Sequence, residues 1–232
     1  MRGKISEVVF DIETLADPPG GGGETDHLSG CPPAEEDPAE VSHRMSLAPL
    51  TARILAVAML NPATGRGKVW YEHPGRAPAG AGDGLFEMLP ATEKEMLAGF
   101  WAAVTAFERL ITFNGRLFDC PFLMLRSALL GVRPSRNLLP YRFSAGEHCD
   151  LLDQLTFYGA MRKFTLEAYC RGFGIARPGG EPWRPDFSLL VTQERYREIA
   201  EHAAATVRAT AELYRRWEGS LSFRRETVSH RQ

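Results

Sequence analysis

Residues 111–119 of the chain read ITFNGRLFD, and this stretch predicts more of the fold than any other. Its apolar beginning predicts a buried strand over 110–113, the Asn-Gly pair predicts a turn, and the residues that follow predict a helix over 118–130. Asp119 falls in the first turn of this helix, where the helix dipole favours an acid. Asp119 therefore either caps the helix or presents a carboxylate beside the end of the strand.

A second acidic motif lies near the start of the chain. Ile5–Ile12 is a short apolar run with β-branched residues, which predicts another buried strand. Asp11 and Glu13 stand at its end, and both project from one face because side chains alternate along a strand. Two such carboxylates repel each other unless a cation lies between them, and hard oxygen ligands suit Mg²⁺ or Mn²⁺. Taken alone, the pair can also be two solvated acids at an exposed strand end.

The remaining segments alternate between strand and helix patterns. Thr51–Leu60 and Gly67–Glu72 predict two strands of an antiparallel hairpin, whereas residues 73–91 are rich in Gly and Pro and predict a loop. Helical spacing of apolar residues marks three helices, at Thr92–Phe107, Thr165–Phe173 and Gln193–Trp217. This order predicts an α/β fold in which helices cover the faces of a mixed sheet.

A single domain is expected over residues 1–220. Residues 17–43 hold five prolines, five glycines and several acids, a composition that predicts a flexible surface insertion. Residues 221–232 are polar and basic and predict a frayed tail.

The bulk composition restricts the class of protein. The 232 residues carry a net charge of −2, which argues against a protein that holds nucleic acid through a broad basic surface. A carboxylate-rich site lowers the net charge, however, and bound divalent metal restores positive potential locally. The four cysteines form no CxxC pair, and no window holds the 18 apolar residues of a membrane span. We therefore expect a cytoplasmic protein with reduced thiols and no membrane contact.

The two acidic motifs together resemble a known family. FDIET at residues 10–14, followed by TFNGRLFDCPFL at 112–123, is similar to the first two motifs of the DEDD superfamily of 3′–5′ exonucleases. More narrowly, the chain resembles the stand-alone exonucleases that are similar to the proofreading domain of family-B DNA polymerases. The resemblance continues through residues 46–58, the helix start at 165–167 and the C-terminal helix.

This resemblance implies an RNase-H-like fold, a mixed β-sheet flanked by α-helices, and a two-metal mechanism. Asp11, Glu13 and Asp119 would bind two Mg²⁺ or Mn²⁺ ions, which activate water and stabilise the leaving 3′ oxygen. Asn114 and Phe118 match positions beside the terminal nucleotide, although Asn114 can also serve only the turn and Phe118 only packing. Basic residues expected to contact phosphate are Arg116, Arg162, Lys163 and Arg184.

The third motif departs from the family pattern, which has Tyr-x-x-x-Asp on the last helix. The register set by residues 207–213 places His202 at the tyrosine position and Thr206 at the aspartate position, on one helix face. His202 can orient or deprotonate a water, but the neutral Thr206 brings no charge to an ion. The second ion is therefore expected to bind weakly or only with substrate phosphate, unless Glu198 or Glu201 reaches the site.

The expected function is a divalent-metal-dependent 3′–5′ exonuclease acting on single-stranded or frayed DNA 3′ ends. The alternative is an exonuclease fold impaired in catalysis that binds a nucleic acid or a protein partner. A zinc site at His148-Cys149-Asp150 is disfavoured, because three adjacent residues of an extended strand cannot all face one ion.

Overall fold

A computed structural model describes residues 5–16, 48–75, 80–81, 84–176, 180, 183 and 185–222. The insertion expected at 17–43 and residues 223–232 of the expected tail lie outside these ranges, as do Cys31 and Arg184. Within them the chain forms a seven-stranded mixed sheet in the order β4-β5-β3-β2-β1-β6-β7. The strands are β1 (Glu7–Ala16), β2 (Ala52–Leu60), β3 (Gly67–Glu72), β4 (Gly80–Ala81), β5 (Phe86–Ala91), β6 (Arg109–Thr112) and β7 (His148–Asp150). The helices are α2 (Glu93–Val104), α3 (Asp119–Leu129), α4 (Leu151–Leu155), α5 (Leu166–Gly172), α6 (Phe187–Thr192) and α7 (Tyr196–Ser220).

Parallel and antiparallel pairs coexist in the sheet, as the sequence predicted. β1 pairs antiparallel with β2 and parallel with β6, and β7 extends the parallel side. β2 and β3 form the predicted antiparallel hairpin. β6 therefore ends beside the middle of β1, because Ile111 opposes Val9, and the turn after β6 comes close to Asp11.

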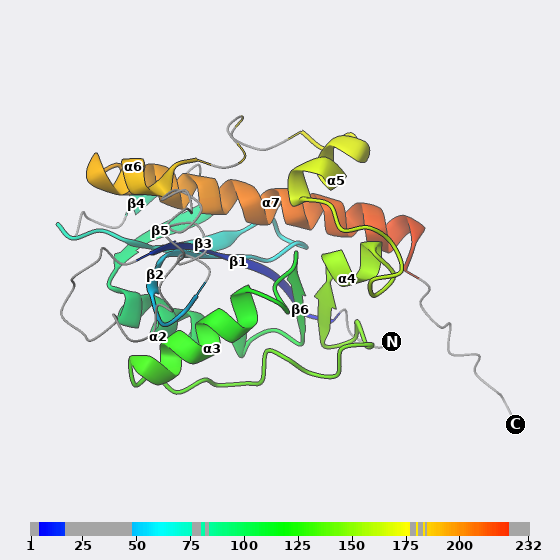
Figure 1. The fold of residues 1–232 in the computed structure, drawn as a ribbon, viewed down its shortest axis with the longest axis horizontal. Coiled ribbons are helices and arrows are strands. Elements are labelled where there is room, and N and C mark those ends of the chain that lie inside the picture. Colours follow the sequence, from blue (N-terminus) through cyan, green and yellow to red (C-terminus); the bar gives the residue numbers. More distant parts are fainter. Residues whose placement is uncertain are drawn as a thin grey trace, which may run out of the picture.

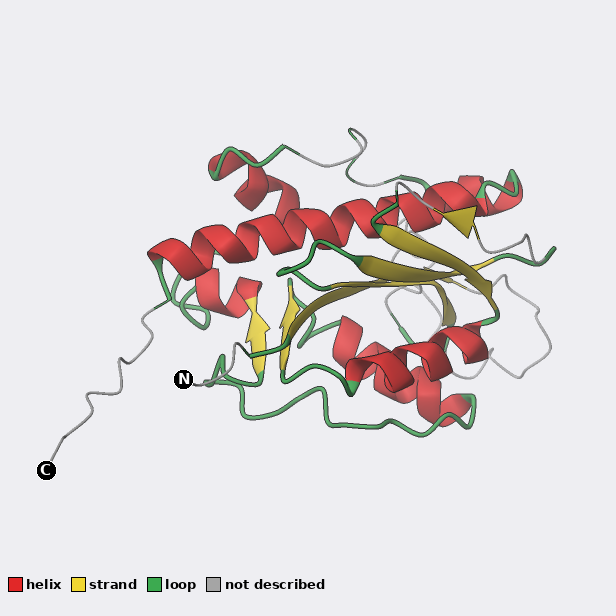
Figure 2. Ribbon diagram, turned by 180° about the vertical axis from the view of Figure 1, so that it is seen from behind, coloured by secondary structure: helices red, strands yellow, loops and turns green. Residues whose placement is uncertain are grey.

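Helices cover both faces of the sheet and create two cores. The long α7 lies across one face, and α2 and α3 lie against the other (Figure 1). Figure 2 shows the same layers from behind. Val9 packs on the α7 side, whereas its neighbours Val8 and Phe10 pack on the α2 and α3 side. The same alternation turns Asp11 and Glu13 toward α7.

β1 continues further than predicted, to Ala16 instead of ending at Ile12. The reason is its partner: β2 stays paired with β1 until Ala16 opposes Ala52, across a register shift between Glu13 and Thr14. The two acids therefore lie within a paired strand, which holds their backbone more firmly than a strand end would.

The prediction of a loop over residues 73–91 was wrong. β5 forms at Phe86–Ala91 and pairs in parallel with β3. Buried Phe86 and Met88 alternate with exposed Glu87, which is the period of a strand, but the surrounding Gly and Pro residues obscured it. Pro90 lies near the end of the strand, where a missing amide donor costs least.

The four predicted helices all form, with shifted ends, and α3 covers Asp119–Leu129. Thr92 caps α2 by a capping box with Glu95, so this helix begins at Glu93. α5 loses one residue at each end, and α7 runs from Tyr196 to Ser220. The short α6 was not predicted. No helix among the described residues is long and apolar enough to cross a membrane, and Cys120, Cys149 and Cys170 are buried free thiols.

Candidate active-site cleft

One cleft of about 1050 Å³ collects nearly all of the residues singled out from the sequence. Its walls come from β1, the turn after β6, the start of α3, the segment that leads into α5, and the middle of α7. The predicted residues that line it are Asp11, Glu13, Asn114, Phe118, Asp119, Arg162, Lys163, His202 and Thr206. Segments more than 180 residues apart in the chain therefore meet at one place.

Asp11 and Asp119 are two carboxyl groups of the cleft, and both have raised pKa values. Oδ1 of Asp119 accepts a hydrogen bond of 3.0 Å from the backbone N–H of Ile12, which fixes α3 against β1 beside Asp11. Burial and then the charge of Asp11 raise the pKa of Asp119 well above its usual range. Burial and then Glu13 likewise raise the pKa of Asp11. Such a carboxylate pair is costly to ionise without a cation.

These raised pKa values predict how stability depends on pH in the absence of metal. The pKa of Asp11 is higher in the folded than in the unfolded chain, so this group makes folding less favourable as pH rises above about 4, the ordinary carboxyl range. We expect the Asp11→Asn variant to lack this decrease. Thermal unfolding in EDTA between about pH 4 and 8 measures it. Identical pH slopes for both proteins would contradict the prediction.

The third acid of the cleft, Glu13, lies beside the histidine of the degenerate motif. His202 Nε2 is 3.3 Å from Glu13 Oε1, and both side chains are largely buried. The ring of Phe187 meets the His202 ring edge to face at 5.4 Å. The pairing joins β1 to α7 across the cleft.

Thr206 lines the cleft, but its hydroxyl is turned toward its own helix. Thr206 Oγ1 donates to the carbonyl oxygen of His202 at 3.1 Å. The two acids considered as replacements lie outside the cleft lining and pair elsewhere: Glu198 with Arg195 at 2.5 Å and Glu201 with Arg197 at 3.1 Å. Neither replaces the missing carboxylate here.

Asp150 holds the turn that carries Asn114. Its carboxylate accepts backbone N–H groups from Asn114 at 2.9 Å and Arg116 at 2.8 Å, and it also caps α4 through Leu152 at 3.0 Å. Asn114 adopts a left-handed φ of 64°, which asparagine tolerates better than most residues. At Gly115 a Cβ atom would lie 2.5 Å from the Thr112 side chain, so the turn requires glycine there. Asn114 therefore both forms the turn and lines the cleft.

Replacement of Asp150 by Ala is expected to lower the free energy of unfolding by about 2 kcal/mol. The backbone N–H groups of Asn114, Arg116 and Leu152 would lose their hydrogen-bond acceptor, and some of these groups are buried. Urea unfolding measures the loss. Asp186→Ala is the matched control: Asp186 is also a helix cap but is exposed and accepts one N–H group, from Leu189. Equal losses in the two variants would contradict the role assigned to Asp150.

The expected phosphate contact of Arg116 is not supported. Arg116 is 8% exposed, and its guanidinium donates to the carbonyl oxygens of Pro140 at 2.8 Å and Tyr141 at 3.3 Å. It is absent from the cleft lining, since its guanidinium is bound to the 140–141 segment. Arg116 is a structural residue that ties this segment to the turn.

The cleft is also lined by residues that the sequence did not single out for chemistry. One is Phe164, which follows the predicted Arg162 and Lys163; the Arg162 guanidinium lies 5.5 Å from the centre of the Phe164 ring. Glu167 lies on α5 and pairs with Arg171 at 2.7 Å. Trp183 also reaches the cleft. Among these lining segments, only the start of α5 could be predicted from the sequence, because Thr165 is a typical N-cap residue.

In the His148-Cys149-Asp150 run, His148 and Cys149 are buried in the interior, and Asp150 holds the turn that carries Asn114. His148 hydrogen-bonds Thr112 Oγ1 at 2.8 Å and the Leu138 carbonyl at 2.9 Å, and burial lowers its pKa to about 4. Within the described ranges, no three His, Cys, Asp or Glu side chains are grouped so that they could hold a metal ion as they stand.

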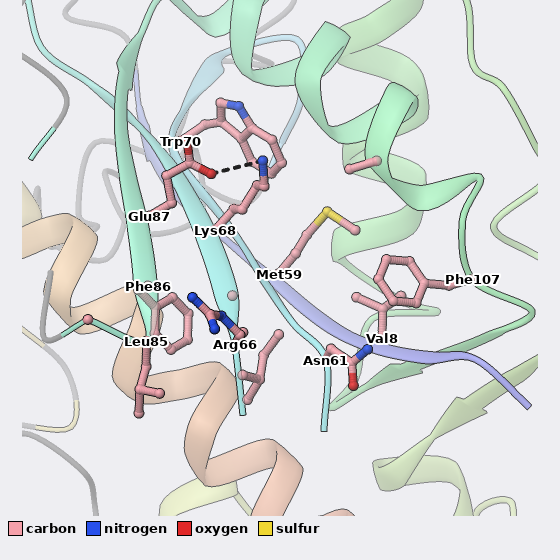
Figure 3. A pocket seen from close by; sticks show the side chains of 14 residues that line it. Val8, Met59, Asn61, Arg66, Lys68, Trp70, Leu85, Phe86, Glu87 and Phe107 are labelled. Atoms are coloured by element: carbon pink, nitrogen blue, oxygen red, sulfur yellow. Dashed lines mark ion pairs between the residues drawn. The ribbon is translucent and has the colours of Figure 1, made fainter. Parts of the chain in front are cut away.

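A second pocket lies elsewhere in the molecule and contains none of the predicted residues. Its volume is about 580 Å³, and its apolar wall includes Val8, Met59 and Phe107 (Figure 3). Its single carboxylate, Glu87, pairs with Lys68 at 2.9 Å. This pocket lacks the grouped acids of the cleft, so the cleft is the candidate site.

Comparison with known proteins agrees with this architecture. The structure is similar to that of the family B DNA polymerase from the hyperthermophilic archaeon Pyrobaculum calidifontis, with a TM-score of 0.57 and 17% sequence identity over 92% of this chain. The match covers 24% of the polymerase, so this chain spans about a quarter of that protein. No curated protein sequence gives a significant match. Residues 84–218, which include Asp119, His202 and Thr206, match a family described as predicted 3′–5′ exonucleases related to the exonuclease domain of PolB. The chain belongs to this PolB-related family of predicted 3′–5′ exonucleases, a family whose function implies nucleic-acid binding.

Proposed function

We propose that the chain is a divalent-metal-dependent 3′–5′ exonuclease that hydrolyses the terminal phosphodiester of single-stranded or frayed DNA. The observation that carries this proposal is that Asp11 and Asp119 both line one cleft of about 1050 Å³. There the Ile12 N–H group donates to Asp119 at 3.0 Å and holds it beside Asp11, and burial, and then the charge of Asp11, raises the pKa of Asp119. A folded protein that holds two buried carboxylates together stores an electrostatic cost that a bound cation removes.

The donor set of the cleft fits one Mg²⁺ or Mn²⁺ ion better than two. Asp11 and Asp119 offer hard oxygen ligands, and Mg²⁺ is commonly bound by one or two carboxylates together with water and substrate phosphate. Glu13 already pairs with His202, and Thr206 brings no charge. We therefore propose a first ion at Asp11 and Asp119 and a second, weaker ion that needs Glu13 and the substrate phosphate. Bound metal would supply charge for an activated water and for the leaving oxygen.

The remaining residues of the cleft act on the substrate. His202 stands 3.3 Å from Glu13, where its imidazole orients a water molecule for attack on the phosphorus. Phe118, half-buried and 5.5 Å from Phe122 between ring centres, offers a face to the terminal base. Lys163 contacts phosphate from the exposed wall, and Asn114 positions the terminal nucleotide.

A second candidate function is a binding module impaired in catalysis. Two observations favour it: the hydroxyl of Thr206 donates to the His202 carbonyl oxygen, and the acids Glu198 and Glu201 of α7 pair with arginines. Such a cleft would still bind a nucleic-acid end.

Incubation of the purified chain with a 5′-labelled DNA oligonucleotide and Mg²⁺ or Mn²⁺ separates the two functions. The exonuclease is expected to produce a ladder of products shortened from the 3′ end, which EDTA prevents. Intact oligonucleotide that stays bound to the protein would support the binding module and contradict the exonuclease.

A further inference from the structure

We propose that an exposed aromatic patch beside the cleft binds the single strand of nucleic acid that leads away from the 3′ end. The patch comprises Tyr141, Phe143, Phe157, Tyr158 and Met161. Exposed fractions of 74% for Tyr141, 60% for Phe143, 56% for Phe157 and 60% for Met161 are large for apolar side chains. This inference rests on the proposed function and names how its substrate is held.

The rings of the patch form a row across two loops. The ring centres of Tyr141 and Phe143 are 5.7 Å apart, and those of Phe143 and Tyr158 are 5.0 Å apart. The first two residues precede β7, and Tyr158 follows α4. Contiguous exposed apolar side chains of this kind mark interaction surfaces, and exposed aromatic faces are what unpaired bases stack upon.

The backbone is unusual at exposed Phe157 and half-buried Tyr158. Phe157 and Tyr158 both have left-handed φ angles, 49° and 59°, which are unfavourable for bulky residues. Tyr158 is held there by its N–H group, which donates to the Asp153 carbonyl at 2.7 Å, and by its hydroxyl, which accepts from Gln154 at 2.8 Å. Strained residues of this kind concentrate at functional sites.

The charge around the patch favours a polyanion. The segment from 156 to 164 contains Arg162 and Lys163 and no acid, and the segment from 133 to 146 contains three arginines and no acid. One of these, Arg142, pairs with Asp153 at 2.5 Å. This local excess of cations contrasts with the net charge of −2 of the whole chain. Aromatic rings combined with cations are the usual means of holding single strands without sequence preference.

The patch is continuous with the cleft. Tyr158 and Arg162 belong to the same loop between α4 and α5 (Figure 1), and Arg162 already lines the cleft. Four residues of extended chain span at most about 14 Å. At the 3.4 Å spacing of stacked bases this distance corresponds to about four nucleotides. The patch therefore lies within about four nucleotides of the Arg162 wall of the cleft, and a strand that leads away from a 3′ end in the cleft along this loop meets it.

Length-dependent binding of oligothymidylate in EDTA tests this inference. For a strand of about 12 nucleotides, we expect Phe143→Ala and Tyr141→Ala each to raise the Kd about tenfold, as for the loss of one base–aromatic stack. For a strand of about three nucleotides, which has fewer bases outside the cleft to stack on the patch, the increase in Kd should be clearly smaller. Phe143→Tyr keeps the ring and should keep the affinity. Leu129→Ala, a 52% exposed residue of α3 outside the patch, is the matched control.

Several results would overturn the patch as a strand-binding surface. Unchanged affinity for the long strand in both alanine variants is one, and equal losses for both strand lengths is another. Binding to anionic vesicles that requires Phe143, without binding to oligonucleotides, is a third. Failure of the proposed exonuclease activity is distinguishable from failure of the patch. If the wild-type chain shortens no DNA but its affinity for the long strand depends on Phe143, the proposed activity is wrong and the strand-binding patch is supported.

Discussion

Replacement of Asp119 by Asn is expected to lower kcat/KM for exonuclease activity by at least about 1000-fold, a loss of about 4 kcal/mol of transition-state stabilisation. The amide oxygen of Asn still accepts the 3.0 Å hydrogen bond from Ile12, so α3 stays in place while the negative charge is removed. Without metal the variant should be more stable than the wild type near neutral pH, because burial and Asp11 make the Asp119 charge unfavourable. Rates on a labelled oligonucleotide and thermal unfolding in EDTA measure the two effects.

Glu198→Gln provides the matched control for this experiment. Glu198 is an exposed acid of α7 that pairs with Arg195 and lies outside the cleft lining. Its neutralisation should leave both activity and metal-dependent stability unchanged. Retention of activity in Asp119→Asn would show that this carboxylate does not bind the catalytic ion. A parallel loss in Glu198→Gln would show that the effect is not specific to the cleft.

Replacement of Thr206 by Asp is expected to raise the exonuclease rate by about 100-fold, because a metal ion that stabilises transition-state charge is worth several kcal/mol. Thr206 lies one helical turn after His202 and lines the same cleft as Asp11. A carboxylate there supplies the fourth negative charge and provides a ligand for the second ion. Titration calorimetry with Mn²⁺ should detect an additional or tighter site, and rates should be compared at several metal concentrations.

Thr206→Asn separates charge from shape. Asn has nearly the size of Asp but brings no charge, so its rate and its Mn²⁺ affinity should remain close to those of the wild type. Equal gains in the two variants would contradict an electrostatic origin. If the wild type proves inactive and only Thr206→Asp shortens DNA, the natural chain is the binding module and the fold retains a restorable active site.

Several elements could be predicted from the sequence because their signals are local. The strand pattern around Asp11, the Asn-Gly turn before Asp119 and the helical stripe of α7 each depend on residues close in the chain. Side-chain alternation sufficed to place Asp11 and Glu13 on one face. By contrast, β5 was missed because Gly and Pro residues around Phe86–Ala91 weakened a short period-two pattern.

The hydrogen-bond partners of residues far apart in the sequence could not be predicted in the same way. Arg116 stands beside the turn in the sequence, but its guanidinium binds the carbonyl oxygens of residues 140 and 141. Asp150 proved to hold the turn that carries Asn114, 36 residues away. No pattern in the sequence indicates which buried donor will meet which acceptor, since that depends on how the elements pack.

The sequence by itself determined the class of fold, and its resemblance to the exonucleases singled out Asp11, Glu13 and Asp119 and the neutral Thr206, because these depend on residue type and on local spacing. Only the tertiary structure decided that Glu13 faces His202 at 3.3 Å, that Thr206 turns to its own helix, and that aromatic residues of two separate loops form one surface. These relations join residues far apart in the chain, and they exist only once β1, α4 and α7 have packed around the common sheet.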